Sequence, residues 1–320
     1  MLPILFHIPY FNIPIYSYGL MLVVAFFVCV EVARALAKYS PIDPELFVNC
    51  GLIALASGLA GARLSHVLEN ISDYTNPKLS IGQNLLNAIN LRSGGLTFYG
   101  GLILATGCCI LYGRRHRAPI RIGMDIVAPC VMIGLGIGRV GCLLNGCCYG
   151  TRCDASVVPW AITYPFASQP YMDQLNSGQI KLADVPKELL RYDPAVYGGI
   201  VPISPDKINS DPKLLALAKV QRSLPVQPAQ IYSTISAFLL AALLIAFFSL
   251  SPTPGRVFAL MLILEGINRF ILELLRVEPP VWGRFSFSMI VGLLLSLMGI
   301  FLWLVFVPHT RQPVPAAGRS

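Results

Sequence analysis

Long apolar segments recur along this 320-residue chain and limit what it can fold into. A run of about 18 or more mostly apolar residues is long enough to cross a bilayer as a helix. Charged residues make up only 12% of the chain, about half the share that a soluble domain carries. The sequence therefore predicts an all-α polytopic membrane protein. Its seven predicted transmembrane helices cover residues 15–36, 45–68, 94–112, 122–144, 228–250, 256–276 and 286–307.

The Lys and Arg residues of the short connecting segments indicate how these helices are oriented. Cytoplasmic loops of membrane proteins are enriched in Lys and Arg. If the N-terminus lies outside, nine such residues fall in short inner segments and four in short outer loops. The chain is therefore expected to have its N-terminus outside and its C-terminus inside. The net charge of +8 reflects this orientation, and no basic stripe interleaved with aromatic residues indicates nucleic-acid binding.

Two segments lie outside the predicted helices of this single membrane domain. Residues 151–225 contain eight basic and seven acidic residues, so they are too polar to span the membrane. They are expected to form a small external head or lid that is inserted within the membrane domain. Residues 308–320 are rich in proline and polar residues and are expected to form a disordered cytoplasmic tail.

Three arginines, Arg63, Arg139 and Arg269, fall inside predicted transmembrane helices. An arginine within the hydrocarbon costs at least ~2.5 kcal/mol on insertion scales. With the N-terminus outside, all three lie near the outer ends of their helices, at the level of Tyr18 and Tyr99. A single arginine near a helix end can extend its guanidinium to the headgroups, and that interpretation stays open for each one. Three at one depth favour a shared cavity.

A stripe of charged residues strengthens this interpretation. Glu265, Arg269, Glu273 and Arg276 follow one another at helical spacing, so they share one face. They form either a ladder of ion pairs that neutralises itself or a set of glutamates that orient Arg269 toward a cavity. Guanidinium groups suit phosphate because they bind it bidentately and stay charged. The residues thus predict a pocket for an anionic lipid or amphiphile beneath the outer headgroups.

Short motifs along nearly the whole chain, except residues 151–225 and the tail, resemble those of bacterial prolipoprotein diacylglyceryl transferases. The arginine-glycine motif and the double-glycine motif are specific when they occur together. The motifs, in order, are "HIPYF" at 7–11, "YGLM" at 18–21, "GGLTFYGGL" at 94–102, "GLGIGRVGCLLNG" at 134–146, "QPAQIY" at 227–232 and "NRFILELLR" at 268–276.

The resemblance implies an enzyme of the bacterial cytoplasmic (inner) membrane whose active site faces the outer leaflet. It would transfer the diacylglyceryl group of phosphatidylglycerol to the lipobox cysteine of prolipoproteins. A thioether would form, and glycerol phosphate would leave. Its partners would be phosphatidylglycerol, the lipobox segments of prolipoproteins and membrane lipids, and no cofactor or metal ion is expected.

The resemblance also implies roles for individual residues. Arg139 and Arg269 would hold the lipid phosphate and stabilise charge on it as the C–O bond breaks, and Tyr99 occupies a third catalytic position. The residues expected to bind or shape the phosphatidylglycerol site are Tyr18, Arg63, Gly100, Gly101, Asn145, Gly146, Gln230, Tyr232, Glu265 and Glu273.

The chain departs from the family pattern at several polar positions. Tyr99 stands where the family has a histidine, and tyrosine, with a pKa near ~10, is a poor base unless cations shift it. Either Tyr99 is shifted by the arginines, or another group such as His66 is the base, or the position only orients the substrate or is an interfacial aromatic. The other departures are Cys142, Cys147, Gln227 and Ser233, which replace an asparagine, a glutamate, a histidine and a glutamate.

Four of the nine cysteines, Cys142, Cys147, Cys148 and Cys153, crowd the outer end of the fourth predicted helix. Disulfides form in oxidising external compartments, so a disulfide that involves Cys153 is the favoured expectation. A zinc site is less favoured because the spacing lacks two C-x-x-C pairs. A third alternative is that Cys142 acts as a covalent nucleophile beside Arg139.

Two further functions remain open. The exchanged polar residues leave room for a related phospholipid-headgroup transferase with another acceptor. They are also compatible with a lipid-binding family member that has lost activity. A transporter is disfavoured because the charges gather at outer depth and the sequence shows no internal repeat.

Overall fold

The computed structural model confirms the all-α class. It describes residues 4–8, 13–75, 80–90, 95, 97–192, 200–203, 207–208, 211–250, 253–276, 280–283 and 285–306. Its long helices are α1 (Ser17–Ala37), α2 (Pro44–Glu69), α5 (Phe98–Arg115), α6 (Ile120–Asn145), α10 (Ala229–Ser249), α11 (Arg256–Glu273) and α12 (Phe287–Val305).

Within the described residues, five helices are long and apolar enough to cross a membrane: α1, α2, α6, α10 and α12. The chain is therefore a multi-pass membrane protein. Helices α5 and α11 are 18 residues long and pack lengthwise against α2 and α12, respectively. Seven spans and an external N-terminus remain predictions.

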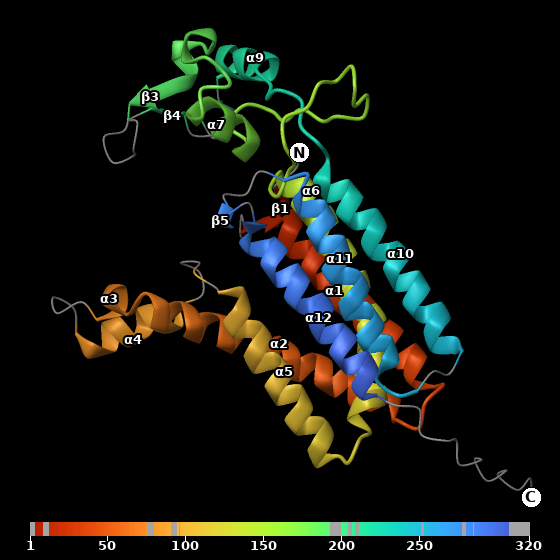
Figure 1. Cartoon of the computed structure of the whole chain (residues 1–320). Coiled ribbons are helices and arrows are strands. Elements are labelled where there is room, and N and C mark those ends of the chain that lie inside the picture. Colours follow the sequence, from red (N-terminus) through yellow and green to blue (C-terminus); the bar gives the residue numbers. More distant parts are fainter. Residues whose placement is uncertain are drawn as a thin grey trace, which may run out of the picture.

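Helix α6 occupies the middle of the bundle, between α1 and α10 (Figure 1). Its buried residues contribute to two apolar cores, one shared with α1 and the start of α2, the other with α10 and α11. Helices α11 and α12 approach closely at glycines, where a Cβ on Gly292 would lie 2.8 Å from the Gly266 carbonyl oxygen. This packing fixes α6 and α11, which carry the intramembrane arginines predicted to bind phosphate.

Asp125, near the N-terminal end of α6, connects this helix to the start of α11 through hydrogen bonds. The Asp125 carboxylate is 3% exposed and accepts hydrogen bonds from the backbone N–H groups of Gly255, at 2.6 Å, and Phe258, at 2.9 Å. These N–H groups lie at the N-terminus of a helix, where they lack intrahelical partners. Asp125 therefore caps α11 and fixes its height against α6.

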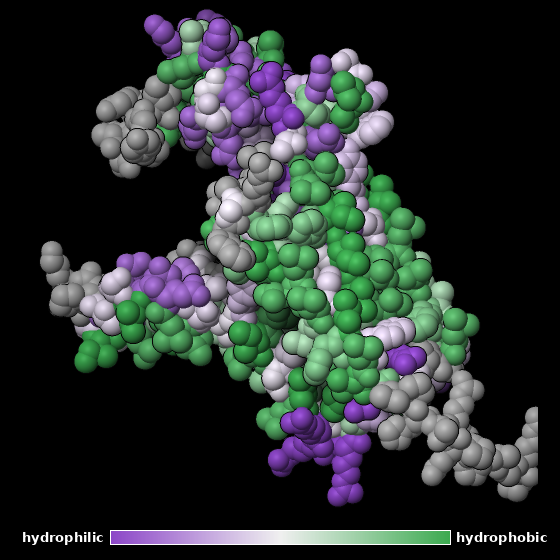
Figure 2. Space-filling model, viewed as in Figure 1, coloured by the Kyte–Doolittle hydropathy of each residue, from purple (hydrophilic) through white to green (hydrophobic). Residues whose placement is uncertain are grey.

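A lateral arm leaves the bundle beyond α2 and contains the short helices α3 (Ile71–Tyr74) and α4 (Ile81–Ile89) (Figure 1). Figure 2 shows hydrophobic residues on one side of this arm and hydrophilic residues on the other. The α4 side chains Ile81, Leu85, Leu86 and Ile89 are all at least 60% exposed. This pattern is typical of a helix that lies in a membrane interface.

The described residues of segment 151–225 form a head at one end of the bundle, and Figure 2 shows their surface as predominantly hydrophilic. The head has its own apolar core, which includes Tyr171 and Leu189. Backbone hydrogen bonds attach it to the bundle, such as Thr151 N to Leu275 O at 2.8 Å. Its helices and strands are α7 (Gln169–Asn176), the 3-10 turns η2 (Leu182–Asp184) and η3 (Lys187–Leu189), β3 (Leu190–Tyr192), β4 (Ile200–Pro202) and α9 (Pro212–Val220).

Two further hairpins lie at the head end of the bundle (Figure 1). One pairs β1 (Ile4–Ile8) with β2 (Ile13–Tyr16) immediately before α1. The other pairs β5 (Pro280–Trp282) with β6 (Phe285–Ser286) immediately before α12. The predicted tail, 308–320, lies outside the described residues.

Candidate active site

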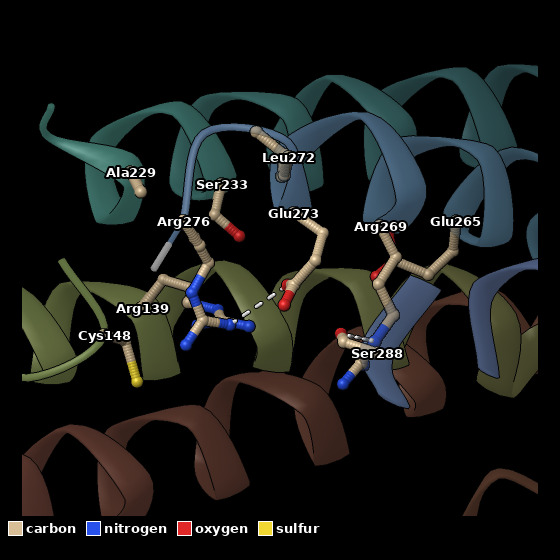
Figure 3. A pocket seen from close by; sticks show the side chains of 10 residues that line it. All are labelled: Arg139, Cys148, Ala229, Ser233, Glu265, Arg269, Leu272, Glu273, Arg276 and Ser288. Atoms are coloured by element: carbon tan, nitrogen blue, oxygen red, sulfur yellow. Dashed lines mark hydrogen bonds and ion pairs between the residues drawn. The ribbon is translucent and has the colours of Figure 1, made fainter. Parts of the chain in front are cut away.

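A charged cavity lies between the helices near the head end of the bundle, and Figure 3 shows the side chains that line it. Three guanidinium groups and two carboxylates meet there in a part of the bundle that is otherwise apolar. The lining residues are Arg139, Cys148, Ala229, Ser233, Glu265, Arg269, Leu272, Glu273, Arg276 and Ser288.

Arg139 projects into this cavity from the last two turns of α6 (Figure 3). Among the described residues, none forms a hydrogen bond with its guanidinium. The same side chain interacts electrostatically with Glu265 and Cys148. A half-buried guanidinium with free donors at a cavity wall is suited to an anionic ligand, because an ionised donor makes the stronger class of hydrogen bond.

Arg269 reaches the same cavity from α11 and is held by α12. Its Nε donates to Ser288 Oγ at 3.0 Å. Glu265, one turn earlier, instead accepts from Asn268 Nδ2 at 3.1 Å. Within the described chain, the two terminal nitrogens of Arg269 have no hydrogen-bond partner. Ser288 thus orients the guanidinium and leaves its outer edge available.

Arg276 and Glu273 form the ion pair of this cavity, with Nη1 and Oε2 3.4 Å apart. Glu273 is 4% exposed and also accepts a hydrogen bond from Ser286 Oγ at 3.0 Å. Among the described residues, no ion pair joins Glu265 and Arg269, the other neighbouring charges of the predicted stripe. The stripe is therefore not a self-neutralising ladder, and three arginines face two glutamates across the cavity.

The chain turns sharply where α6 ends beside the cavity. Gly146 has a φ of 76°, and its N–H donates to the Cys142 carbonyl at 2.9 Å, which closes the helix that Asn145 ends. Gln230, fully buried on α10, donates from Nε2 to the Cys147 carbonyl at 2.8 Å and to the Tyr164 hydroxyl at 3.0 Å. Gln230 therefore fixes this turn against the head.

Tyr232 lies where α10 meets the head. Its hydroxyl accepts a hydrogen bond from Trp160 Nε1 at 2.5 Å and donates to Gln227 Oε1 at 2.9 Å. Tyr18 lies on the first turn of α1 and packs against α6, where a Cβ on Gly141 would be 3.0 Å from Tyr18 Cδ2. Neither residue lines the cavity.

Three cysteines gather at the same turn. The Sγ atoms of Cys142, Cys147 and Cys148 all lie within 4.8 Å of one another. All nine cysteines are in the described part of the chain and all are free thiols, so the predicted disulfide at Cys153 is absent. Hydrogen bonding from the Cys142 and Cys147 thiols lowers the pKa of Cys148, and the charges of Arg139 and Arg276 act in the same direction.

The structure places Arg63 away from the cavity. Its side chain is buried, and Nε and Nη2 each donate at 2.7 Å to the Ala88 and Asn87 carbonyls at the end of α4. Its guanidinium also lies over the Tyr74 ring, 5.2 Å from the centroid. Arg63 therefore fastens the arm to α2, whereas the sequence favoured a lipid-binding role.

Gly100 and Gly101 are likewise outside the cavity, at the contact between α5 and α2. A Cβ on Gly101 would lie 2.8 Å from the Gly58 carbonyl oxygen, so these glycines allow the two backbones to approach. Tyr99 precedes them and is 45% exposed, with its ring packed edge-on against Phe287 at 6.1 Å.

His66, the alternative base, also lies at this contact. A Cβ on Gly95 would clash with its ring, and the ring lies edge-on to Tyr74 at 6.2 Å. The structure thus brings Arg139, Arg269, Glu265 and Glu273 together. It leaves Tyr99 and His66 outside the cavity.

Some residues that line the cavity were not predicted from the sequence. Arg276 stood in the charged stripe but was not predicted to bind the lipid, and it lies beyond the end of α11, which stops at Glu273. Ser288 and Ser233 come from other helices, and no sequence spacing relates them to Arg269. Cys148 was noted only as one of four crowded cysteines.

Ser288→Ala is expected to lower activity at this site about tenfold, because loss of one hydrogen bond to a charged group costs about 1.5 kcal/mol. The guanidinium of Arg269 would then sample several rotamers. The measurement is the rate of the reaction tested below, with Ser296→Ala as the control. Ser296 is on the same helix and donates to the Ile263 carbonyl, away from the cavity. Equal rates in the two variants would show that Ser288 does not position Arg269.

A family model for prolipoprotein diacylglyceryl transferase matches residues 3–305. Three similar curated proteins all carry the name phosphatidylglycerol–prolipoprotein diacylglyceryl transferase. The Rhodopirellula baltica protein is 36% identical over 170 residues, which cover 53% of this chain and 34% of that relative. The Clostridium tetani protein is 25% identical over 305 residues, with 95% of this chain and 97% of the relative covered.

The Xanthomonas campestris protein is 27% identical over 316 residues, with 95% and 92% covered. The chain thus spans about a third of the first relative's length and nearly all of the other two.

Proposed function

Since the chain belongs to the prolipoprotein diacylglyceryl transferase family, we propose that it transfers the diacylglyceryl group of phosphatidylglycerol to the lipobox cysteine of prolipoproteins. The reaction forms a thioether and releases glycerol phosphate. The enzyme acts in the bacterial cytoplasmic membrane, with the cavity toward the outer leaflet. The observation that carries this proposal is the convergence of Arg139, Arg269 and Arg276 on one cavity near the head end of an apolar bundle.

The three arginines act on the phosphate of the donor lipid. As the bond between the glyceryl carbon and the phosphate oxygen breaks, negative charge grows on the departing glycerol phosphate. Arg139 and the outer edge of Arg269 donate hydrogen bonds to it, and Ser288 orients Arg269 before the reaction. Fixed donors in a site that excludes water stabilise a developing charge more than water does. Glu273 holds Arg276 at the side of the same anion.

The acceptor thiol must lose its proton before it attacks. A thiol with a pKa near ~8.5 is mostly protonated at neutral pH, and the thiolate is the nucleophile. The arginines of the cavity favour the anion. Tyr99 lies outside the cavity and packs against Phe287, so it is poorly placed to remove this proton.

Tyr99→Phe is therefore expected to transfer lipid at a rate within about threefold of that of the unsubstituted protein. Loss of a general base would instead lower the rate roughly 100-fold. The substitution removes only the hydroxyl and retains the ring that packs on Phe287. The rate is measured at several pH values. A loss above tenfold would restore Tyr99 as a proton acceptor.

The proposed reaction is tested directly with a synthetic lipobox peptide. The purified protein is mixed with the peptide in phosphatidylglycerol micelles, and the peptide is followed by mass spectrometry. The expected result is a mass gain of one diacylglyceryl group, absent when serine replaces the peptide cysteine. No gain from a folded protein that still binds the lipid would overturn the transfer and favour a lipid-binding family member.

A further inference from the structure

The strongest feature that the proposed function does not use is the group of three thiols at the end of α6. Cys142 lies in the last turn of the helix, and Cys147 and Cys148 lie just after it. Their Sγ atoms are mutually within 4.8 Å, although the sequence provides no pair of C-x-x-C motifs. Helix α6 ends in a left-handed turn at Gly146, which folds the two later thiols back over the first.

The backbone at this turn is held in an uncommon conformation. Cys148 has a φ of 58°, in the left-handed region that non-glycine residues rarely adopt. Such conformations cost about 1–3 kcal/mol and cluster at functional sites. Gln230 holds the neighbouring Cys147 carbonyl at 2.8 Å from the opposite helix. The packing therefore keeps a conformation that directs the third sulfur to the other two.

We propose that Cys142, Cys147 and Cys148 bind one Zn²⁺ ion and leave its fourth coordination position for the acceptor thiol. The role of the acceptor thiol rests on the proposed function. Sulfurs 2.3 Å from zinc in a tetrahedron are about 3.8 Å apart, so the cluster needs only small side-chain rotations. Catalytic zinc sites have three protein ligands and one open position, whereas structural sites have four protein ligands. Three clustered sulfurs match the open type.

The location of the cluster supports a role in the transfer. Cys148 and Arg139 line the same cavity, so a thiol on the zinc would lie beside the donor phosphate. Three thiolates and Zn²⁺ carry one net negative charge, and a fourth thiolate makes two. Arg139 and Arg276 both interact electrostatically with Cys148 and offset this charge. Tyr99 and His66 lie outside the cavity, so neither is placed to deprotonate the acceptor thiol. Binding to zinc would deprotonate it instead.

The chemistry balances without an oxidant or reductant. The acceptor thiol releases its proton to water when its sulfur binds Zn²⁺, because a coordinating thiol is deprotonated. A sulfur lone pair then attacks the glyceryl carbon that bears the phosphate oxygen. The C–S bond forms, the C–O bond breaks, and its electron pair leaves on glycerol phosphate beside Arg139 and Arg269. The neutral thioether is a weaker ligand and dissociates, and zinc stays Zn²⁺.

The site is tested first by metal binding in the full-length protein, purified with a phosphine reductant and freed of metal. Co²⁺ is used as the probe because its thiolate complexes absorb visible and near-ultraviolet light. One Co²⁺ per chain is expected, displaced by Zn²⁺. Cys148→Ser and Cys147→Ser are each expected to weaken binding at least ~10-fold, in line with losses at other metal sites. Absence of binding by the unsubstituted protein would overturn the proposal.

Cys153→Ser is the matched control, because it removes a thiol five residues after Cys148 that is outside the cluster. It is expected to bind Co²⁺ as tightly as the unsubstituted protein. Thermal unfolding of each apo variant shows that it is folded. Equal loss in Cys153→Ser and Cys148→Ser would overturn the assignment of ligands.

The open position is tested by adding the lipobox peptide to the Co²⁺ protein in micelles without phosphatidylglycerol. The thiol peptide is expected to shift the Co²⁺ absorption, whereas the peptide with serine does not. Identical spectra with both peptides would overturn thiol coordination. If the shift occurs but no lipid is transferred on adding phosphatidylglycerol, the proposed function fails and the zinc site stands. If metal-free protein transfers lipid at the full rate, the zinc role fails and the proposed function stands.

Discussion

Arg139→Ala is expected to lower the rate of diacylglyceryl transfer by about 100- to 1000-fold, as loss of one oriented donor to a developing oxyanion does. The guanidinium of Arg139 lies at the cavity wall, and no described residue forms a hydrogen bond with it, so its donors are available to the phosphate. Arg269→Ala is expected to have a loss of similar size, because its outer edge faces the same anion. The measurement is the initial rate of mass gain of the lipobox peptide at saturating phosphatidylglycerol.

Arg256→Ala is a matched control for both variants. Arg256 also lies at an end of α11, but at the opposite end of the helix from the cavity, where its guanidinium stacks 4.9 Å from the Trp303 ring centroid. Its removal changes the net charge by the same amount without changing the cavity, so transfer is expected to continue. Arg139→Lys keeps the charge but loses the bidentate geometry, and an intermediate rate is expected. Unchanged transfer in Arg139→Ala would eliminate the phosphate clamp.

Gly100→Val is expected to destabilise the folded protein by about 1–3 kcal/mol, because overpacking at a tight contact forces backbone shifts. A Cβ at this position would clash with the Ser65 side chain and lie 2.7 Å from the Gly61 carbonyl oxygen. The neighbouring atoms include backbone, which moves less readily than a side chain. The expected observation is a lower thermal unfolding midpoint in detergent and a loss of monodisperse protein.

Gly107→Val separates this clash from the helix propensity of valine. Gly107 lies two turns further along α5, and a Cβ there meets no atom within 4 Å. Both substitutions replace a helical glycine with the same β-branched residue. An unfolding midpoint for Gly107→Val close to that of the unsubstituted protein is expected. Equal destabilisation by the two substitutions would show that the contact between α2 and α5 is not tight at Gly100.

The long helices were predictable from the sequence because a bilayer requires a minimum length of apolar residues, whatever the helices pack against. Helix α6 was expected at 122–144 and occupies Ile120–Asn145. The approach of Arg139 to Arg269 was also predictable, because both lie at similar depth and few solutions bury a guanidinium in hydrocarbon. The alignment of Glu265, Arg269 and Glu273 on α11 likewise follows from helical periodicity, whereas Arg276 lies beyond the end of the helix.

The interactions of Arg63 show where this reasoning ends. Its depth matched that of the other arginines, but its partners are the Asn87 and Ala88 carbonyls, more than 20 residues away in the chain. The depth of a residue in the membrane gives only its position along the membrane normal. The direction of a side chain around its helix, and the neighbour that it meets, depend on how the helices pack.

Hydropathy and charge act locally along the chain, so the membrane class, the approximate helix positions and a cationic site could be predicted from the residues alone. Which charges share the cavity depends on the packing of the helices. This packing separated Arg63 and Tyr99 from the cavity and added Arg276 and Ser288. It also brought Cys142, Cys147 and Cys148 together through the left-handed turn after α6. Contacts between helices depend on their relative rotation and on close approach at glycines, and neither has a local signature in the sequence.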